Sequence, residues 1–144
     1  LLYWGRWLVV SAQASNHFGL VPTVDTQADD AGVKEFAQKN GMSLSSSYED
    51  ALDDPSIDAV VLVTHHNLHP EQVIADAGAG KNVYTEKPFA LNKSLAERAV
   101  AACKDAGVVV PLGHDQRFYP VIMEMKRLIN DGELGTFLYD EAIV

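Results

Sequence analysis

Short apolar stretches rich in β-branched residues alternate along this chain with stretches of helical spacing, and this alternation most constrains the fold. The run Ala59 to Thr64 is apolar almost throughout, which is typical of a strand buried on both faces. A helical pattern that Pro70 opens and Gly80 ends follows it. Because this order recurs, the sequence predicts an α/β fold, a doubly wound parallel sheet with helices on both faces.

The other predicted elements follow the same order. Strands are predicted over 18–24, 42–46, 82–86, 108–112 and 136–144, and helices over 5–14, 26–40, 48–52, 94–106 and 120–131. Ser94 to Glu97 has the form of a capping box that can start or reinforce its helix. Cys103 lies on the apolar stripe of that helix, which indicates a role in packing rather than in chemistry.

Composition narrows the class of protein. A chain of 144 residues is long enough for one domain with a core. Twenty acidic against eleven basic residues give a net charge of −9, which argues against binding to nucleic acid. Cys103 is the only cysteine, so the chain forms no internal disulfide. No apolar run is long enough for a membrane span, and we expect a soluble, cytoplasmic protein.

Polar residues follow four of the predicted strands. They are Asp25, the loop Thr64 to His69, the pair Glu86-Lys87, and the loop His114 to Arg117. Ligands bind at the carboxyl ends of strands in open parallel sheets, so these residues are predicted to share one rim. Pro88 has no N–H and ends its strand at Lys87. The alternative for Glu86 and Lys87 is a surface ion pair at a strand end.

Several motifs, in this order and spacing, carry a resemblance to a known family. They are Asp54-Pro55-Ser56-Ile57-Asp58-Ala59-Val60-Val61, the loop Thr64 to His69, Gly80-Lys81-Asn82-Val83 before Glu86-Lys87-Pro88, and Arg117-Phe118-Tyr119-Pro120 before a helix that ends in Gly132-Glu133-Leu134-Gly135. Over essentially its whole length the chain resembles the glucose-fructose oxidoreductase and inositol dehydrogenase family, Gfo/Idh/MocA. The resemblance implies a Rossmann-type, dinucleotide-binding domain.

The chain departs from the family at its N-terminus. Trp4 and Gly5 supply only the last part of the G-x-G-x-x-G fingerprint, and most of the first strand is absent. We therefore expect a fragment with a truncated Rossmann domain at 1–135 and the first strand of a second, α+β substrate domain at 136–144. That second domain carries the family's proton-accepting histidine, so the fragment itself is expected to be inactive and weakly stable.

The resemblance places chemistry at the end of the strand that Pro88 follows. Lys87 is expected beside the nicotinamide and the substrate hydroxyl, where a cation stabilises a developing alkoxide and joins proton transfer. Glu86 is expected to hydrogen-bond the nicotinamide ribose. Pro88 is expected to follow a cis peptide bond that aims Lys87 into the crevice. Lys87 is therefore the predicted catalytic residue.

Asp25 follows a predicted strand about twenty residues after Gly5, where an acid reads the adenosine ribose. No Arg follows Thr26 closely, so NAD is favoured, with NADP not excluded. The alternative for Asp25 is a helix cap.

The resemblance implies that Thr64 and Asn67 lie along the nicotinamide ribose and that His69 begins the next helix within the cofactor site. A zinc site on His65, His66 and His69 is the competing interpretation; in its absence His65 and His66 are exposed loop residues. Arg117 is expected on the nicotinamide side, with a structural salt bridge as its alternative.

The resemblance thus implies an NAD(P)-dependent oxidoreductase that transfers a hydride between nicotinamide and a secondary alcohol of a sugar, inositol or related polyol. The alternative is a dinucleotide-binding regulator or sensor without turnover. No metal, membrane or nucleic acid is expected as a partner, and the whole protein is expected to be a homo-oligomer that associates through its second domain.

Overall fold

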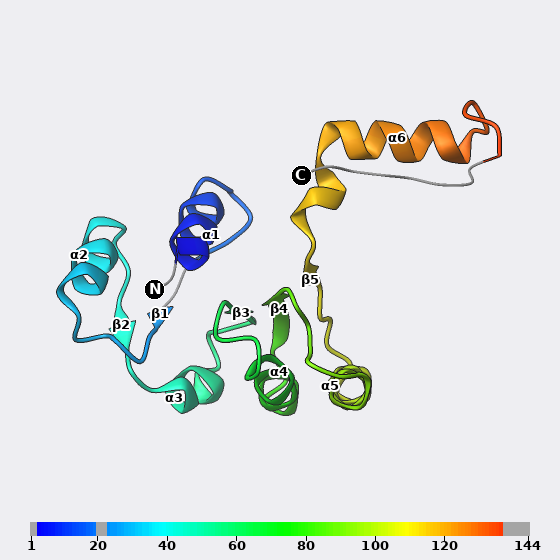
Figure 1. Ribbon diagram of the computed structural model, residues 1–144. Helices are drawn as coiled ribbons and strands as arrows, with labels where there is room; N and C mark the ends of the chain where they lie inside the picture. The colour runs from blue at the N-terminus through cyan, green and yellow to red at the C-terminus, as the bar shows by residue number, and fades with distance from the viewer. Residues whose placement is uncertain (1–2, 20–22, 137–144) are drawn as a thin grey trace. The chain divides into compact units, whose positions relative to one another are not determined.

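The computed structural model of this chain describes residues 3–19 and 23–136. It divides into two compact units, residues 1–112 and 113–144, which are described separately. The first unit contains α1 (Tyr3–Gln13), β1 (Thr23–Val24), α2 (Ala31–Lys39), β2 (Leu44–Ser45), α3 (Tyr48–Asp53), β3 (Ala59–Leu62), α4 (His69–Gly78), β4 (Asn82–Glu86) and α5 (Lys93–Ala106) (Figure 1). After β5 (Leu112–Gly113), the second unit contains the 3-10 helix η1 (Asp115–Phe118) and α6 (Pro120–Asn130).

The strands form two parallel groups. β1 pairs with β2, with Thr23 opposite Leu44. β3 pairs with β4, with Leu62 opposite Thr85, and β5 follows on the other side of β4. The β1–β2 and β3–β4 pairings are both parallel, and a helix connects the two strands of each pair. The α/β class with an open parallel sheet is thereby confirmed.

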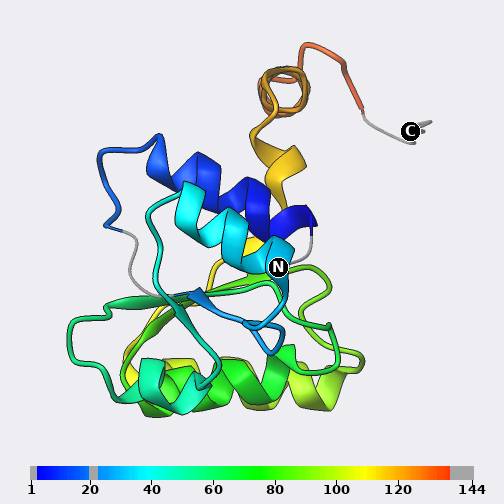
Figure 2. The same ribbon diagram turned by 90° about the vertical axis from the view of Figure 1, so that its left-hand side faces the viewer.

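Helices cover the strands from two sides. Figure 2 shows α1 and α2 on one side and α3, α4 and α5 on the other, as in a doubly wound fold. The guanidinium of Arg6 lies over the ring of Phe36 at 5.1 Å from its centroid, and the Gln13 side chain donates to the Asn40 carbonyl at 2.7 Å. These contacts join α1 to α2 and to its C-terminal cap.

The core of the first unit lies between the β3–β4 pair and the helices α4 and α5. Its buried members are apolar and come from all four elements: Leu62, Val73, Ala77, Val83, Ala99 and Cys103. Each fully buried Val or Leu side chain contributes about 1.5–3 kcal/mol through removal of apolar surface from water. Cys103 is 2% exposed within this cluster, so its predicted packing role is confirmed.

The prediction that the Ala59–Thr64 strand is buried on both faces is wrong. The assigned strand β3 ends at Leu62, and its burial alternates: Leu62 is buried, whereas Val61 is 51% exposed. Helix α4 packs against the β3–β4 pair on the face that contains Leu62. Successive side chains of a strand point to opposite faces, so Val61 points away from the face on which α4 packs. Among the described residues, that opposite face is less well covered.

Three other predicted strands, over 18–24, 42–46 and 108–112, are shorter than expected. Of 18–24, only Thr23–Val24 is a strand; Phe18 is 67% exposed, and residues 20–22 lie outside the described residues. Its partner β2 is also two residues long, which limits the ladder. Of 108–112, only Leu112 is assigned to a strand, although the carbonyls of Val109 and Pro111 accept hydrogen bonds from β4. Pro111 has no N–H to return to a ladder.

The helix predictions are confirmed in existence and type, and one cap is corrected. Helix α5 begins one residue before the proposed capping box, since the Asn92 side chain accepts the Leu95 N–H at 3.0 Å and is the N-cap. Ser94 lies inside the first turn. The helix ends at Gly107, which has a left-handed φ of 70° that favours glycine.

In the second unit, Arg127 on α6 forms three ion pairs. The Arg127 guanidinium pairs with Glu124, Asp131 and Glu133 at 2.7–2.8 Å, which connects α6 to the turn after it. The predicted strand at 136–144 lies almost wholly outside the described residues. Within 3–19 and 23–136, no helix has the length and apolar character needed to cross a bilayer.

Helix α4 also carries a buried acid, Asp76. Asp76 is fully buried on α4, and its Oδ1 is 2.6 Å from the Tyr48 hydroxyl, which also lies 3.2 Å from the Gln72 carbonyl. The Asp76 Oδ2 atom has no hydrogen-bond partner among the described residues. A phenol has one proton, so the Tyr48 hydroxyl donates to only one of the Asp76 Oδ1 and Gln72 carbonyl oxygens at a time. Burial raises the pKa of Asp76 to about 6, against the opposing effect of the Tyr48 hydrogen bond.

Asp76→Asn tests this arrangement. Because the pKa of Asp76 is raised on folding, its protonated form stabilises the protein fully below the unfolded value, about 4, and this contribution is lost as pH rises through about 6. Asp76→Asn should therefore be more stable than the parent at pH 8, by about 1–3 kcal/mol, and by roughly half as much at pH 5, which lies midway between the unfolded and folded pKa values of Asp76. Thermal or urea unfolding at both pH values measures this.

The matched control is Asp105→Asn, which removes the same charge from an exposed position of α5. It should change the free energy of unfolding little at either pH. Equal effects of the two substitutions at pH 5 and pH 8 would contradict a buried, protonated Asp76.

Candidate functional site

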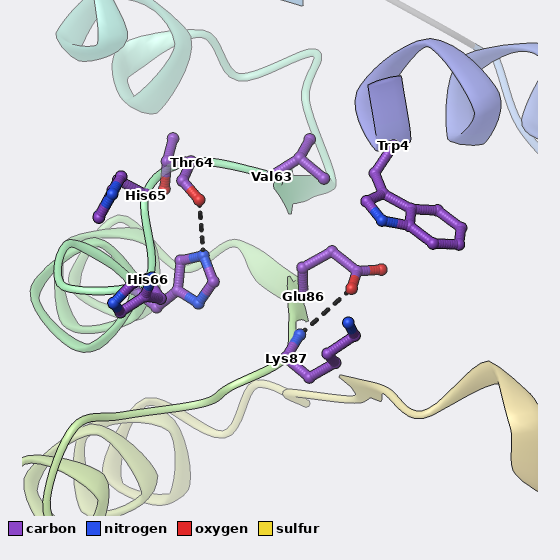
Figure 3. A pocket seen from close by; sticks show the side chains of 8 residues that line it. Trp4, Val63, Thr64, His65, His66, Glu86 and Lys87 are labelled. Atoms are coloured by element: carbon purple, nitrogen blue, oxygen red, sulfur yellow. Dashed lines mark hydrogen bonds between the residues drawn. The ribbon is translucent and has the colours of Figure 1, made fainter. Parts of the chain in front are cut away.

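One pocket of the first unit gathers side chains from three places in the sequence. Trp4 comes from the first turn of α1, Glu86 and Lys87 from the end of β4, and the remaining lining residues are Val63, Thr64, His65, His66 and His69 from the loop after β3 and the start of α4. Figure 3 shows the Glu86 and Lys87 side chains on the side of Trp4 and Val63, with the His65 ring at the far end. The predicted rim is thus partly assembled.

The parallel pairing of β3 and β4 explains why these segments meet. Leu62 lies opposite Thr85, so the two strands end at the same edge. The residues that follow, from Val63 and from Glu86, continue from neighbouring positions of that edge. No single stretch of sequence could place both sets of polar groups in one pocket.

Lys87 is exposed at the end of β4. Its backbone N–H donates to the Glu86 carboxylate at 3.2 Å, and the Tyr84 hydroxyl donates to the other oxygen of that carboxylate, also at 3.2 Å. In the described part of the chain, the Lys87 ammonium has no hydrogen bond or ion pair, so the structure does not contain the surface ion pair with Glu86. The Lys87–Pro88 peptide bond is cis, as the resemblance implied.

The loop after β3 is held by its own polar side chains. The Thr64 hydroxyl hydrogen-bonds the Gln72 side-chain carbonyl on α4. The His65 Nδ1 atom lies 2.8 Å from Asn67 Oδ1, and the His65 and His66 rings pack with their centroids 4.5 Å apart. Both histidines are exposed. Over the described ranges, no three His, Cys, Asp or Glu side chains are grouped as a metal site.

His69 differs from the two histidines before it, because it is buried at 1% exposure. Its Nδ1 atom lies 2.9 Å from the Pro88 carbonyl oxygen, and its Nε2 atom lies 3.1 Å from the Thr64 carbonyl oxygen. The second contact is the dashed line that ends on Thr64 in Figure 3. His69 therefore links the loop after β3 to the segment after β4.

Asp25 directly follows β1, as predicted, but it does not cap α2. The Asp30 carboxylate is that cap, since it accepts the Gly32 and Val33 N–H groups at 2.8 and 3.1 Å. The Asp25 carboxylate instead accepts the Gln27 N–H at 2.8 Å within the turn. The cap alternative for Asp25 is therefore wrong, and Asp25 is not among the lining residues of the pocket.

The remaining predicted residues are located as follows. Gly5 is buried in the first turn of α1, next to Trp4. Arg117 belongs to the second unit, in η1, where it lines a shallow hollow with Phe118, Met123 and Lys126. No ion pair of Arg117 occurs within the described residues. Its predicted place beside the nicotinamide stays a prediction.

Sequence reasoning missed three contributors to the site. Val63 lines the pocket, Gln72 holds the Thr64 hydroxyl, and Tyr84 holds the Glu86 carboxylate. Tyr84 could have been found, because residues i and i+2 of a strand share a face and Glu86 follows it at that spacing. The pairing of Thr64 with Gln72 depends on how α4 packs and has no comparable signal in the sequence.

Comparisons with known proteins identify the family. Residues 11–114 match the model of the family GFO_IDH_MocA, described as an oxidoreductase family with an NAD-binding Rossmann fold. The chain is 37% identical over 90 residues to the scyllo-inositol 2-dehydrogenase (NAD(+)) of Bacillus subtilis, covering 62% of this chain and 26% of that protein. It is 33% identical over 131 residues to the 1,5-anhydro-D-fructose reductase of Ensifer adhaerens, covering 90% and 38%.

Solved structures agree with the sequence comparison. The WlbA dehydrogenase of Bordetella pertussis, in complex with NADH and UDP-GlcNAcA, superposes with a TM-score of 0.78 at 31% identity, over 88% of this chain and 36% of that one. The chain thus spans about a third of the length of the proteins it resembles. Three observations point to the same family: the match over residues 11–114, the parallel Rossmann architecture and the Glu86-Lys87-Pro88 segment. The chain belongs to the Gfo/Idh/MocA family of NAD-binding oxidoreductases.

Proposed function

We propose that the whole protein containing this chain transfers a hydride between NAD and a secondary alcohol carbon of a sugar, inositol or related polyol. The observation that carries the proposal is the Lys87 ammonium, unpaired among the described residues, in a pocket with Trp4, Thr64 and Glu86. The relatives named above support the substrate class, because one is an inositol dehydrogenase and another is an anhydrofructose reductase.

The lining of the pocket fits the nicotinamide end of a dinucleotide. Trp4 and Val63 offer apolar surface to a flat ring, while Thr64 and Glu86 offer polar groups to a ribose. Asn67 and Pro88 flank the same two segments, and we assign them to the cofactor site with His69 as a support. Asp25 is assigned to the adenosine ribose, since an acid after the second strand accepts ribose hydroxyl hydrogen bonds and repels a 2′-phosphate.

Lys87 is the proposed catalytic residue. Bound NAD would supply the hydride acceptor for alcohol oxidation. As the alcohol loses its proton, negative charge develops on its oxygen, and a neighbouring ammonium stabilises that charge. A lysine that meets substrate in a water-poor site can also pass a proton to or from that oxygen. Glu86 precedes Lys87 in the sequence and is assigned to the nicotinamide ribose.

Other predictions from the sequence keep their status as predictions. They are the domain boundary at 135/136, the approach of Arg117 to the nicotinamide, the homo-oligomer, the location in the cytoplasm and the inactivity of the 144 residues alone. A regulator that binds dinucleotide without turnover is the alternative to the enzyme. The Lys87 experiment below separates the two.

Lys87→Met in the full-length protein should lower kcat for NAD reduction by about 10²–10⁴-fold in the polyol that the parent oxidises fastest. The reason is the loss of the cation that stabilises the alkoxide. NADH affinity should change by less than about threefold, because the lost interaction is made mainly with the reacting oxygen. Steady-state absorbance and NADH titration measure the two quantities.

Lys93→Met is the control, since Lys93 is an exposed lysine on α5. It should turn over substrate as the parent does. Undiminished turnover in Lys87→Met would contradict a catalytic role for Lys87. NADH binding by the parent with no turnover of any polyol in the panel would favour the regulator.

Asp25→Asn tests the cofactor assignment. Loss of a charged acceptor for the ribose should raise the KM for NAD about 10- to 100-fold with little change in kcat. Loss of its repulsion should leave NADP less affected, so the preference for NAD narrows. Asp29→Asn, in the same turn region, is the control, because Asp29 forms an ion pair with Lys34 at the surface. An unchanged ratio of KM values for the two cofactors would show that Asp25 does not contact the ribose.

A further inference from the structure

The His69 ring lies between two groups of one kind. Its Nδ1 atom faces the Pro88 carbonyl oxygen at 2.9 Å, and its Nε2 atom faces the Thr64 carbonyl oxygen at 3.1 Å. A backbone carbonyl oxygen only accepts hydrogen bonds. Both ring nitrogens therefore face acceptors, in a position that is 99% shielded from water.

A neutral imidazole does not satisfy this geometry. It has one N–H donor, and its other nitrogen presents a lone pair. That lone pair would face the lone pairs of a carbonyl oxygen at about 3 Å, which is a repulsive contact in a buried site. The doubly protonated ring has an N–H on each nitrogen and satisfies both carbonyls. The two distances are those of ordinary N–H···O hydrogen bonds.

The two carbonyls belong to the two segments that frame the pocket. The β3–β4 ladder ends at Leu62 and Thr85, so this pairing does not join the two segments to each other beyond that point. Thr64 follows β3, and Pro88 follows Lys87. A bond to the Pro88 carbonyl thus fixes the backbone immediately after Lys87, while β4 fixes the backbone before it.

We propose that His69 is a positioning residue that, as the doubly protonated imidazolium, ties the Thr64 loop to the Lys87–Pro88 segment and so fixes Lys87 for chemistry. The effect of His69 on turnover rests on the proposed oxidoreductase function. The protonation state of the His69 ring does not depend on that function, because the two carbonyl contacts involve only residues of this chain.

Other ionisable groups line the same pocket and bear on the charge of His69. Glu86 is the acid among them and favours an imidazolium, whereas Lys87 disfavours it. His65 and His66 are two further ionisable side chains of the pocket, and both are exposed. A pH dependence of turnover alone would therefore not identify His69, and the test needs a signal from its own ring.

Ring ¹⁵N NMR of the histidine-labelled full-length protein supplies that signal. The His69 resonances are assigned as those that disappear in His69→Gln. We expect both His69 ring nitrogens to carry protons and to exchange slowly with water, while the exposed histidines exchange fast. One His69 ring nitrogen with the shift of a free lone pair at neutral pH would overturn the proposal, whatever the activity.

Kinetics then tests the positioning role. The Gln side chain of His69→Gln can donate to only one of the two carbonyls, so Lys87 is less well fixed. We expect kcat to fall about tenfold or more, with the Kd for NADH within about threefold of the parent. His17→Gln, which changes an exposed histidine after α1, is the matched control and should behave as the parent.

The outcomes separate this proposal from the proposed function. A parent without polyol turnover refutes the enzyme but leaves the NMR result as a direct test of the imidazolium clamp. Loss of NADH binding in a folded His69→Gln, with kcat intact at saturating cofactor, would make His69 a cofactor ligand and contradict the positioning role. If His69→Gln fails to fold, through-bond assignment of the His69 ring in the parent protein replaces the comparison, and its spectrum still decides.

Discussion

The parallel pairing of β3 with β4, and the burial of β4 against α4 and α5, bring the loop after β3 and the end of β4 together in the site. Val83 and Thr85 are fully buried, and they anchor a five-residue strand whose partner ends at the same edge. Burial of such side chains stabilises the unit by a few kcal/mol each and allows only one register, because a slip by one residue would expose them. The polar groups after the two strands therefore meet.

Polar groups within this core are accommodated in three different ways. The Lys81 ammonium, in a side chain 7% exposed, donates to the carbonyls of Asp54 and Ile57 at 2.6 and 2.8 Å. The His69 ring faces two carbonyls, and Asp76 shares a hydrogen with Tyr48 while one of its oxygens has no partner in the described structure. A buried charge without partners costs roughly several kcal/mol, so cations here meet carbonyl oxygens, and burial raises the pKa of the Asp76 carboxyl to about 6.

Buried Lys81 and His69 also join segments that strand pairing does not reach. Lys81 ties the turn before β3 to the start of β4, and His69 ties the loop after β3 to the segment after β4. Both ends of the β3–β4 pair are thus closed by a side chain that donates to backbone carbonyls. Membership of an NAD-binding family agrees with such a rigid edge, since a hydride is transferred only between atoms held in contact.

Local patterns determined much of this protein. Helix periodicity, the proline and glycine at the two ends of α4, and the apolar run of β3 were sufficient to predict the elements and their order, and Pro88 marked the end of β4. These signals depend on neighbouring residues, so they can be read without a structure. Strands whose ends depend on a partner, such as β1 and β5, were predicted too long. Asp30 rather than Asp25 caps α2, and Asn92 rather than Ser94 caps α5.

Only the tertiary structure decided which polar residues act together. Three histidines within five positions look equivalent in the sequence, yet His65 and His66 are exposed and His69 is buried between two carbonyls. The partner of Asp76 is 28 residues away, and the pocket joins Trp4 to Lys87 across most of the first unit. The physical reason is that hydrogen bonding and burial depend on distances in space, which packing of α4 against the sheet sets and local sequence does not.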